Sequence, residues 1–541
     1  MNKKVLSNLI TTIFFLIFLC IGSLIFNDYL VTPDEPLHRI NGFISLKYIF
    51  ELFIPDSLLL SELGNIPDLN NDWRKTYGVL FDLPLSSIEI LFNLNIQDAF
   101  LLRHFLTFLI FFISTIFFFY LLKIHLKTNN FLSLLGVLIL ISTPRIFSNS
   151  FYNGKDILFL SLIIIATFYS LNLLKNFNKK NLFLACLFCA FASNIRIMGI
   201  YLPVLTYIFY VFLPDDQKFK NNINFFLYFF LGYFLILYIT WPFLWLNPLE
   251  NFFLILKESA SYPIHWDFEI LYLGNYLNPE NLPWHYFFVW FLSTTPIIFV
   301  FIIFFGILIF LKKYFNFFLK ITFDKNLKLW KTSDQMTSLF IFLCFFIPIF
   351  FVITLNSTLY NGWRHLYFVY PFLIYLAIYG LNVLSDIFNN NFKNFFITLV
   401  VIQIISNIYF IFKTHPVQNV YFNFISKPYI ENNLPVDYWG LGNKKTIDFL
   451  LSQQINFSVA NSSFTPLNNL KYSLKPEFSY SKNITFLGTQ EKNKNTSDFI
   501  FTNYYYNRNP KNMEKFKIPE NYKSYYKLII DGIIVNEVFA K

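Results

Sequence analysis

Charged residues are scarce in this chain. Asp, Glu, Lys and Arg make up 14% of its 541 residues, whereas 55% are hydrophobic and 22% are aromatic. A water-soluble globular domain carries roughly 25% charged residues. The shortage excludes a chain that is soluble throughout, and it indicates that most of the protein lies in lipid.

Cysteine is also scarce. All four cysteines, Cys20, Cys186, Cys189 and Cys344, lie inside apolar runs, which excludes a disulfide framework in an extramembrane domain. Cys186 and Cys189 have the spacing of a redox or metal pair, but their neighbours are Leu, Phe and Ala. We interpret them as a pair that is embedded in lipid or packed between helices.

Long apolar runs are abundant. A transmembrane helix needs roughly 20 apolar residues. The first run has no cleavage site after it, so it is interpreted as an uncleaved span. The stretch 181–213 is too long for one helix and divides at residues 193–196. The sequence predicts a polytopic α-helical membrane protein with about 11 transmembrane helices, near residues 9–27, 101–122, 131–147, 157–174, 181–195, 197–213, 223–245, 287–311, 337–355, 366–385 and 395–412.

The net charge of +10 indicates the orientation of these spans. Basic loops face the cytoplasm, so the N-terminus is predicted to be cytoplasmic, and no nucleic-acid partner is expected. The residues able to do chemistry fall in the opposite loops, 28–100, 148–156, 246–286 and 356–365. Lysines concentrate in five other loops, and these loops lie on one side of the membrane only if 181–213 forms two spans. The lysine-rich loops are 123–130, 175–180, 214–222, 312–336 and 386–394.

Residues 414–541 have a different character. They are polar and Asn-rich and contain no span. Asp531-Gly532 is typical of a hairpin turn. The sequence therefore predicts a transmembrane domain over 1–413 and a small extramembrane α/β domain over 414–541. The expected elements of the small domain are a helix at 444–453 and strands at 456–460, 498–504 and 527–540.

The first outer loop carries an acidic pair, Asp34-Glu35, followed by His38. A carboxylate here is able to accept a proton from an attacking hydroxyl, as a general base. The alternative is structural, because Asp34 ahead of Pro36 is also typical of the N-cap of a helix. That helix, near 37–53, is amphipathic, and we expect its apolar face to lie against the membrane surface.

Four cations, Arg145, Lys155, Arg196 and Arg364, fall in outer segments, where the positive-inside rule disfavours them. Such cations need a partner, and an anionic lipid phosphate is one candidate. The alternative is that each side chain extends to a lipid headgroup. His285 is a candidate ligand for phosphate or a metal ion, whereas the tryptophans near it are typical of an interfacial aromatic belt.

The ordered set of motifs resembles the bacterial GT-C glycosyltransferases related to the protein O-mannosyltransferases and the lipid A aminoarabinose transferases. The resemblance spans nearly the whole chain and departs at Gly154, where proline is expected. The matching segments are Asp34-Glu35-x-x-His38, Pro144-Arg145, Asn153-x-Lys155-Asp156, Arg196 with Gly199, Trp241-Pro242-x-x-Trp245, Pro283-Trp284-His285-Tyr286, Gly362-Trp363-Arg364-His365 with Tyr370-Pro371, His415-Pro416-Val417-Gln418, Tyr421-Phe422-Asn423 and Asp437-Tyr438-Trp439-Gly440.

The resemblance implies a GT-C fold whose catalytic domain, 1–413, transfers a sugar with inversion from a polyprenyl-phosphate donor. Asp34 is then the base, positioned by Glu35 or His38. No cofactor is fixed by the resemblance, and a divalent metal ion stays open because no ligand spacing decides it. The donor phosphate would be held by Arg145, Lys155, Arg196, Arg364 and His365, and the further site candidates are Asn153, Asp156, Trp284, His285 and Tyr286.

The family branch also implies a bacterial inner membrane, with the active site and the 414–541 domain on its periplasmic side. The acceptor hydroxyl or amine would belong to a glycolipid, a lipopolysaccharide or a protein among the membrane lipids. A transporter or flippase for an anionic lipid is the alternative function, but it would place polar residues at mid-membrane. A scaffold that only displays the 414–541 domain leaves the acidic pair and the outward cations unexplained.

Overall fold

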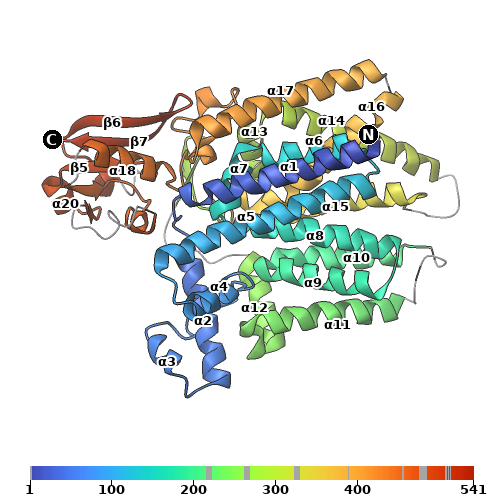
Figure 1. Ribbon diagram of the computed structural model, residues 1–541, viewed down its shortest axis with the longest axis horizontal. Helices are drawn as coiled ribbons and strands as arrows, with labels where there is room; N and C mark the ends of the chain where they lie inside the picture. Colours follow the sequence, from blue (N-terminus) through green and yellow to red (C-terminus); the bar gives the residue numbers. More distant parts are fainter. Residues whose placement is uncertain are drawn as a thin grey trace.

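Apolar helices form the bulk of the structure (Figure 1). By length and composition, eight of the described helices are able to cross a membrane, or nine if one bent pair counts as a span. The chain is therefore an integral membrane protein. Parts of the basic loops 214–222, 312–336 and 386–394 lie outside the described residues. The computed structural model describes residues 3–541 except 215–217, 219–221, 261–268, 322–328, 388, 454–455, 474–483, 506–508, 510 and 512.

The long helices follow the predicted spans. Within 181–213 two shorter helices, α9 (Lys179–Ile195) and α10 (Tyr201–Val211), are joined by a 3-10 turn, η4 (Ile197–Ile200). The predicted break in this stretch is confirmed. The eight described helices that are long and apolar enough to cross a membrane are α1 (Lys3–Ile25), α5 (Ile96–Tyr120), α8 (Asp156–Lys175), α11 (Asn222–Thr240), α14 (Ile297–Ile321), α15 (Ser333–Thr354), α16 (Tyr370–Ile387) and α17 (Asn390–Thr414).

Two predicted spans are interrupted. α6 (Asn130–Ile141) turns by 70° into α7 (Pro144–Tyr152). Residues 148–152, predicted as part of an outer loop, are therefore helical, and they are buried. Pro144 occupies the first turn of α7, where its missing N–H leaves no intrahelical bond unmade. The predicted span 287–311 divides into α13 (Tyr286–Thr294) and α14.

Short helices outside the spans surround the N-terminal segment of α2 (Glu35–Phe53). The prediction that the apolar face of this helix lies on the membrane is wrong, because Phe43 and Ile44 are buried against protein. The close approach of α2 to α4 depends on Gly42, where a Cβ would lie 2.4 Å from the carbonyl oxygen of Asp82. The further elements outside the spans are α3 (Leu58–Glu62), η2 (Trp73–Thr76), α4 (Asp82–Leu91), η6 (Pro242–Trp245), α12 (Pro248–Ala260), β1 (Ile270–Tyr272) and β2 (Asn275–Leu277), of which α3, α4 and η6 contact α2.

The C-terminal residues form a five-stranded sheet beside the helical bundle (Figure 1). Its order is β4-β3-β5-β7-β6, with β3 parallel to β4 and β5 and the other pairs antiparallel. Asp531 and Gly532 both have positive φ, which confirms the predicted hairpin. The elements are α18 (Gly442–Gln453), β3 (Phe457–Asn461), β4 (Ile484–Leu487), α20 (Glu491–Thr496), β5 (Phe499–Thr502), α21 (Met513–Phe516), β6 (Lys523–Ile530) and β7 (Ile533–Ala540).

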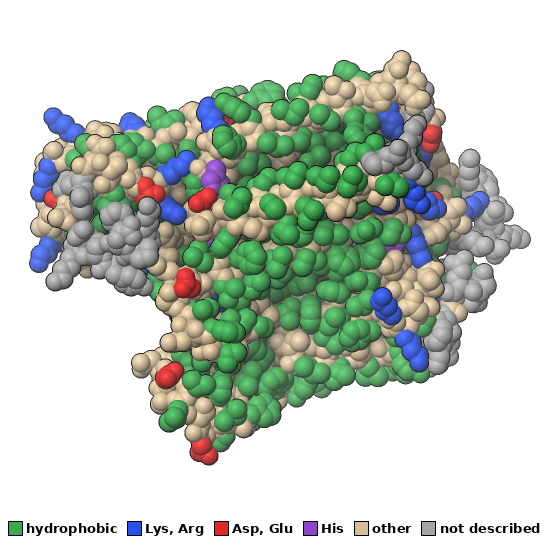
Figure 2. Space-filling model, in the orientation of Figure 1, with side chains coloured by type: hydrophobic (Ala, Val, Ile, Leu, Met, Phe, Trp, Pro, Cys, Tyr) green, Lys and Arg blue, Asp and Glu red, His purple; other side chains and the backbone are tan. Residues whose placement is uncertain are grey.

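Side-chain types are unevenly distributed over the surface. Apolar side chains cover the middle of the helical bundle, and Lys and Arg gather at its end away from the sheet (Figure 2). An apolar belt between polar ends is the pattern expected of a bundle in a bilayer. The cytoplasmic N-terminus, and the division into a catalytic domain 1–413 and a periplasmic domain 414–541, stay predictions.

Candidate active site

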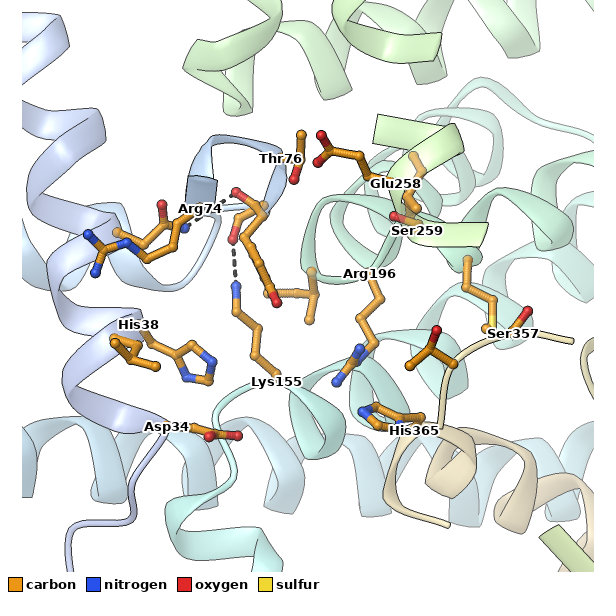
Figure 3. Close-up of a pocket in the computed structure, with 18 of the residues that line it drawn as sticks. Asp34, His38, Arg74, Thr76, Lys155, Arg196, Glu258, Ser259, Ser357 and His365 are labelled. Carbon is orange, nitrogen blue, oxygen red and sulfur yellow. Dashed lines mark hydrogen bonds between the residues drawn. The ribbon is translucent and has the colours of Figure 1, made fainter. Parts of the chain in front are cut away.

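A cavity of about 190 Å³ lies between α2, α12 and the segments that carry the predicted cations. Its wall is built from parts of the chain that are far apart in sequence (Figure 3). Trp241, the first residue of the Trp241-Pro242-x-x-Trp245 motif, is buried in this wall. The charged and hydrogen-bonding side chains of the lining include Asp34, His38, Arg74, Lys155, Arg196, Glu258, Tyr360, Arg364 and His365.

Asp34 precedes the first turn of α2. It occupies the N-cap position, but its side chain makes no capping hydrogen bond. Its Oδ2 instead accepts a hydrogen bond from Nη1 of Arg364 at 2.8 Å. The side chain of Asp34 is 34% exposed and lines the cavity. Asp34 therefore stands at the predicted N-cap position without capping the helix through its side chain, and its carboxylate is accessible to a ligand.

Arg364 begins η7 (Arg364–Val369), the 3-10 turn that leads into α16. Its Nη1 also lies 3.7 Å from Oδ2 of Asp156. The guanidinium faces the rings of Tyr360 and Trp439, with its Cζ 4.9 and 4.6 Å from their centroids. Its buried Nε has no hydrogen-bond partner among the described residues. The side chain is thus fixed on several sides while one strong donor stays available.

Asp156 joins two of the cations. Oδ1 of Asn153 accepts the N–H of Asp156, the first residue of α8, at 3.0 Å, and its Nδ2 donates to Oδ2 of Asp156 at 2.9 Å. Nη2 of Arg196 pairs with the other oxygen, Oδ1. Asp156 therefore lies between the guanidinium groups of Arg196 and Arg364. Arg196 remains 28% exposed, and within the described part of the chain its Nε has no partner.

Lys155 connects the cavity to a second buried ion pair. Its Nζ donates to the carbonyl oxygen of Gly78 and lies 3.2 Å from Oδ2 of Asp82, whose Oδ1 accepts from Nη1 of Arg103 at 2.8 Å. Burial lowers the pKa of Lys155, although Asp82 opposes the shift. Burial raises the pKa of Asp82, but Lys155 and Arg103 outweigh it and hold that pKa below its ordinary value.

Gly78 allows this arrangement. A Cβ on Gly78 would lie 1.4 Å from the carbonyl oxygen of Asn194, in the turn that leads to Arg196. Oδ1 of Asn194 accepts the N–H of Leu80 at 3.0 Å. The first outer segment is therefore packed directly against the 193–196 break, which brings Lys155 and Arg196 to the same cavity.

Glu35 and His38 differ in position, although both belong to the first motif. Glu35 is buried behind the cavity, where Oε2 contacts Nε2 of His104 at 2.8 Å and Oε1 accepts the N–H of Thr32 at 2.7 Å. His38 lines the cavity. Burial, reinforced by Lys155 and Arg103, lowers the pKa of His38 despite the opposing carboxylate of Asp82. His38 is therefore neutral at pH 7.

The other predicted site residues do not line the cavity. Arg145 is buried, donates through Nε to the carbonyl oxygen of Tyr421 at 3.0 Å, and faces the ring of Phe422. Nδ1 of His285 is hydrogen-bonded to the Tyr272 hydroxyl at 2.6 Å. Trp284 and Tyr286 lie in different surroundings, because Trp284 is exposed whereas Tyr286 is buried in the core.

Several lining or supporting residues were missed by the sequence analysis. Arg103 and His104 stand at the outer end of the predicted span 101–122, and their charge at that end is a signal that could have identified them. Asp82, Arg74 and Glu258 carry no comparable local signal. Asp82 is held by the distant Arg103 and Lys155, whereas Arg74 is held by Asp72, two residues before it.

The side chains that could bind a metal ion are His, Cys, Asp and Glu. Within the described residues, no group of three or more His, Cys, Asp and Glu side chains is placed to hold a metal ion. The carboxylates of Asp34, Asp82 and Asp156 are each paired with cations instead. Cys186 and Cys189 lie buried on α9 as free thiols.

Comparison with known proteins finds a solved structure to which the chain is similar. No protein-family model matches the sequence, and no curated protein matches it. The chain is similar to the crystal structure of ArnT from Cupriavidus metallidurans bound to undecaprenyl phosphate, with 12% identity, coverage of 97% of each chain and a TM-score of 0.39. These values assign neither a family nor an activity to the chain, so its function is inferred from its own residues.

Proposed function

We propose that this protein is an inverting GT-C glycosyltransferase of a bacterial inner membrane, which moves a sugar from a polyprenyl-phosphate donor to a hydroxyl or amine acceptor at the periplasmic face. One observation carries the proposal: a cavity-facing carboxylate, Asp34, meets the three cations Lys155, Arg196 and Arg364 in a single cavity. The resemblance of the ordered sequence motifs supplies the reaction class.

Asp34 is the proposed general base. The acceptor atom attacks the anomeric carbon as the bond from that carbon to the phosphate oxygen breaks, and the electron pair leaves with the phosphate. The acceptor proton passes to the carboxylate of Asp34. Because Arg364 holds Oδ2 at 2.8 Å, the direction of the carboxylate is fixed before the substrate binds.

The cations are the proposed phosphate site. The partly exposed Arg196 and the Nε of Arg364, which has no partner in the described part of the chain, are N–H donors for phosphate oxygens, and Lys155 adds a third charge. Fixed donors in a site with little water stabilise charge as it develops on the leaving phosphate. We therefore expect them to supply a large part of the acceleration, while the sugar passes through an oxocarbenium-like transition state.

Sugar transfer from a pool of polyprenyl-phosphate donors to membrane acceptors tests this proposal. Asp34→Asn removes the base and is expected to lower the rate by ~10²- to 10⁴-fold, and Arg364→Ala is expected to abolish transfer. Asp334→Asn is the matched control, because Asp334 is an exposed carboxylate paired with Lys127 outside the cavity.

Each other outcome is informative. Transfer at the wild-type rate by Asp34→Asn would remove Asp34 from the role of base. If wild-type protein transfers nothing from several donors, yet moves the donor lipid between leaflets of a vesicle, the flippase function replaces the transferase.

A further inference from the structure

The C-terminal α/β domain touches the segment that carries Asp34. The N–H of Val31 donates to Oγ of Ser473 at 2.7 Å, and Nδ2 of Asn469 donates to the carbonyl oxygen of Thr32 at 3.3 Å. Val31 and Thr32 lie three and two residues ahead of Asp34. The backbone that leads into the proposed base is therefore held by residues more than 400 positions later in the chain.

The same domain touches the segment that carries Arg364. The ring of Trp439 lies over the guanidinium, with its centroid 4.6 Å from Cζ. The hydroxyl of Tyr505 donates to Oδ1 of Asn361, three residues ahead of Arg364. The segments that carry Asp34 and Arg364 thus both contact one domain, which lies at one end of the bundle in Figure 1.

The loop that carries Trp439 is rigidly built. The carboxylate of Asp437 accepts the N–H groups of Leu441 and Gly442 at 3.1 and 2.8 Å, just where α18 begins. Gly440 has φ +71°, and a Cβ there would lie 2.6 Å from Cγ2 of Thr465, so this turn requires glycine. These backbone supports lie within the C-terminal domain and do not involve Arg364, and the indole of Trp439 also packs edge-on against Tyr152 of α7, with 5.7 Å between the ring centroids.

We propose that the C-terminal domain positions the Asp34–Arg364 pair, and that Trp439 is its principal positioning residue. What the pair then does rests on the proposed function. A guanidinium is planar and stacks on an aromatic face. The indole of Trp439 therefore sets the plane of Arg364, so that Nη1 meets Asp34 while Nε has no hydrogen-bond partner among the residues that the structure describes. Ser473 and Asn469 fix the approach of Asp34 from the other side.

Steady-state transfer by position 439 variants tests the proposal. Trp439→Leu removes the aromatic face and is expected to lower kcat by ~3- to 30-fold, the range of a cation–π contact. Trp439→Phe keeps an aromatic face and is expected to recover most of that loss. Trp330→Leu is the matched control, since Trp330 is also buried but stacks on Phe209.

A double-mutant cycle separates positioning from a general structural role. If Trp439 acts through the guanidinium, Trp439→Leu should change kcat less than ~2-fold when Arg364 is already lysine. An equal loss in both backgrounds, or wild-type transfer by Trp439→Leu, overturns the proposal. Should Trp439→Leu fail to fold, Ser473→Ala tests the other contact, with Ser458→Ala as control because Ser458 bonds within the domain to Asp498.

Hydrogen–deuterium exchange distinguishes failure of this inference from failure of the proposed function. Trp439→Leu should accelerate exchange in residues 28–36 and 356–366 and leave the strands β6 and β7 unchanged. If wild-type protein shows no transfer but exchange follows this pattern, the domain positions the pair although the function is wrong. Unchanged exchange in both segments overturns the positioning role whatever the activity.

Discussion

Nη1 of Arg364 lies 2.8 Å from Oδ2 of Asp34, although 330 residues separate them in the sequence. The contact joins the start of α2 to the start of η7, and Asp156 links the same guanidinium to Arg196. The proposed base and the proposed phosphate site are therefore one connected group of charges, so a change at one member should be measurable at the others.

Arg364→Lys keeps the charge at position 364 but removes the planar fork. A lysine ammonium is a compact charge that does not reproduce the contacts to Asp34 and Asp156 together with stacking on Trp439. We expect kcat to fall roughly 10- to 100-fold, as for loss of a charge-assisted hydrogen bond. Initial rates at saturating donor measure this. Arg39→Lys, at a pair with Glu89 outside the cavity, should keep the wild-type rate.

Arg196→Ala should weaken donor binding. Arg196 is partly exposed in the cavity, so it is expected to hold the phosphate before and during reaction, which raises KM more than it lowers kcat. We expect donor KM to rise ~10- to 100-fold in detergent micelles. Lys47→Ala, at an outer pair with Asp68, is the control. A lower kcat at unchanged KM would contradict a ground-state phosphate contact.

Asp82→Asn should destabilise the protein. Asp82 is buried between Lys155 and Arg103, so its loss leaves two buried cations without a counter-charge. Breaking a buried pair in this way costs roughly 3–5 kcal/mol of unfolding free energy. Unfolding in detergent measures the change. Asp68→Asn, where the carboxylate is 57% exposed, should cost less than about 1 kcal/mol, and equal losses at both sites would contradict the burial argument.

The lowered pKa of His38 predicts a pH dependence of stability. The unfolded chain protonates this histidine near its ordinary value of 6.5, but the folded protein does so only at lower pH. Between these values the unfolded state binds more protons, so stability is present above pH 6.5 and is lost as the pH falls. We expect the melting temperature to fall less between pH 7.5 and pH 5.5 for His38→Gln than for the wild-type protein. An equal fall in melting temperature for the variant and the wild-type protein would contradict a lowered pKa of His38.

The apolar runs and the turn chemistry were predictable because they are local. Helices of about 20 apolar residues are dictated by burial of backbone hydrogen bonds in lipid, and the Asp531-Gly532 turn follows from the positive φ that its two residues tolerate. The interruption at Pro144 was missed because two short helices and one span have the same apolar composition. Burial of Phe43 and Ile44 was missed because an amphipathic face fits a protein surface as well as a membrane surface.

The sequence alone predicts a membrane-spanning chain, a small sheet-containing region after it, and scarce charges beside the ends of the spans. Which of these charges meet depends on the folded structure. Arg145 and Arg364 look alike as outer cations, yet Arg364 reaches Asp34 while Arg145 donates to the carbonyl oxygen of Tyr421. The reason is physical: apolar burial depends on composition along a few turns of helix, whereas an ion pair depends on the distance between side chains that the whole fold must bring together.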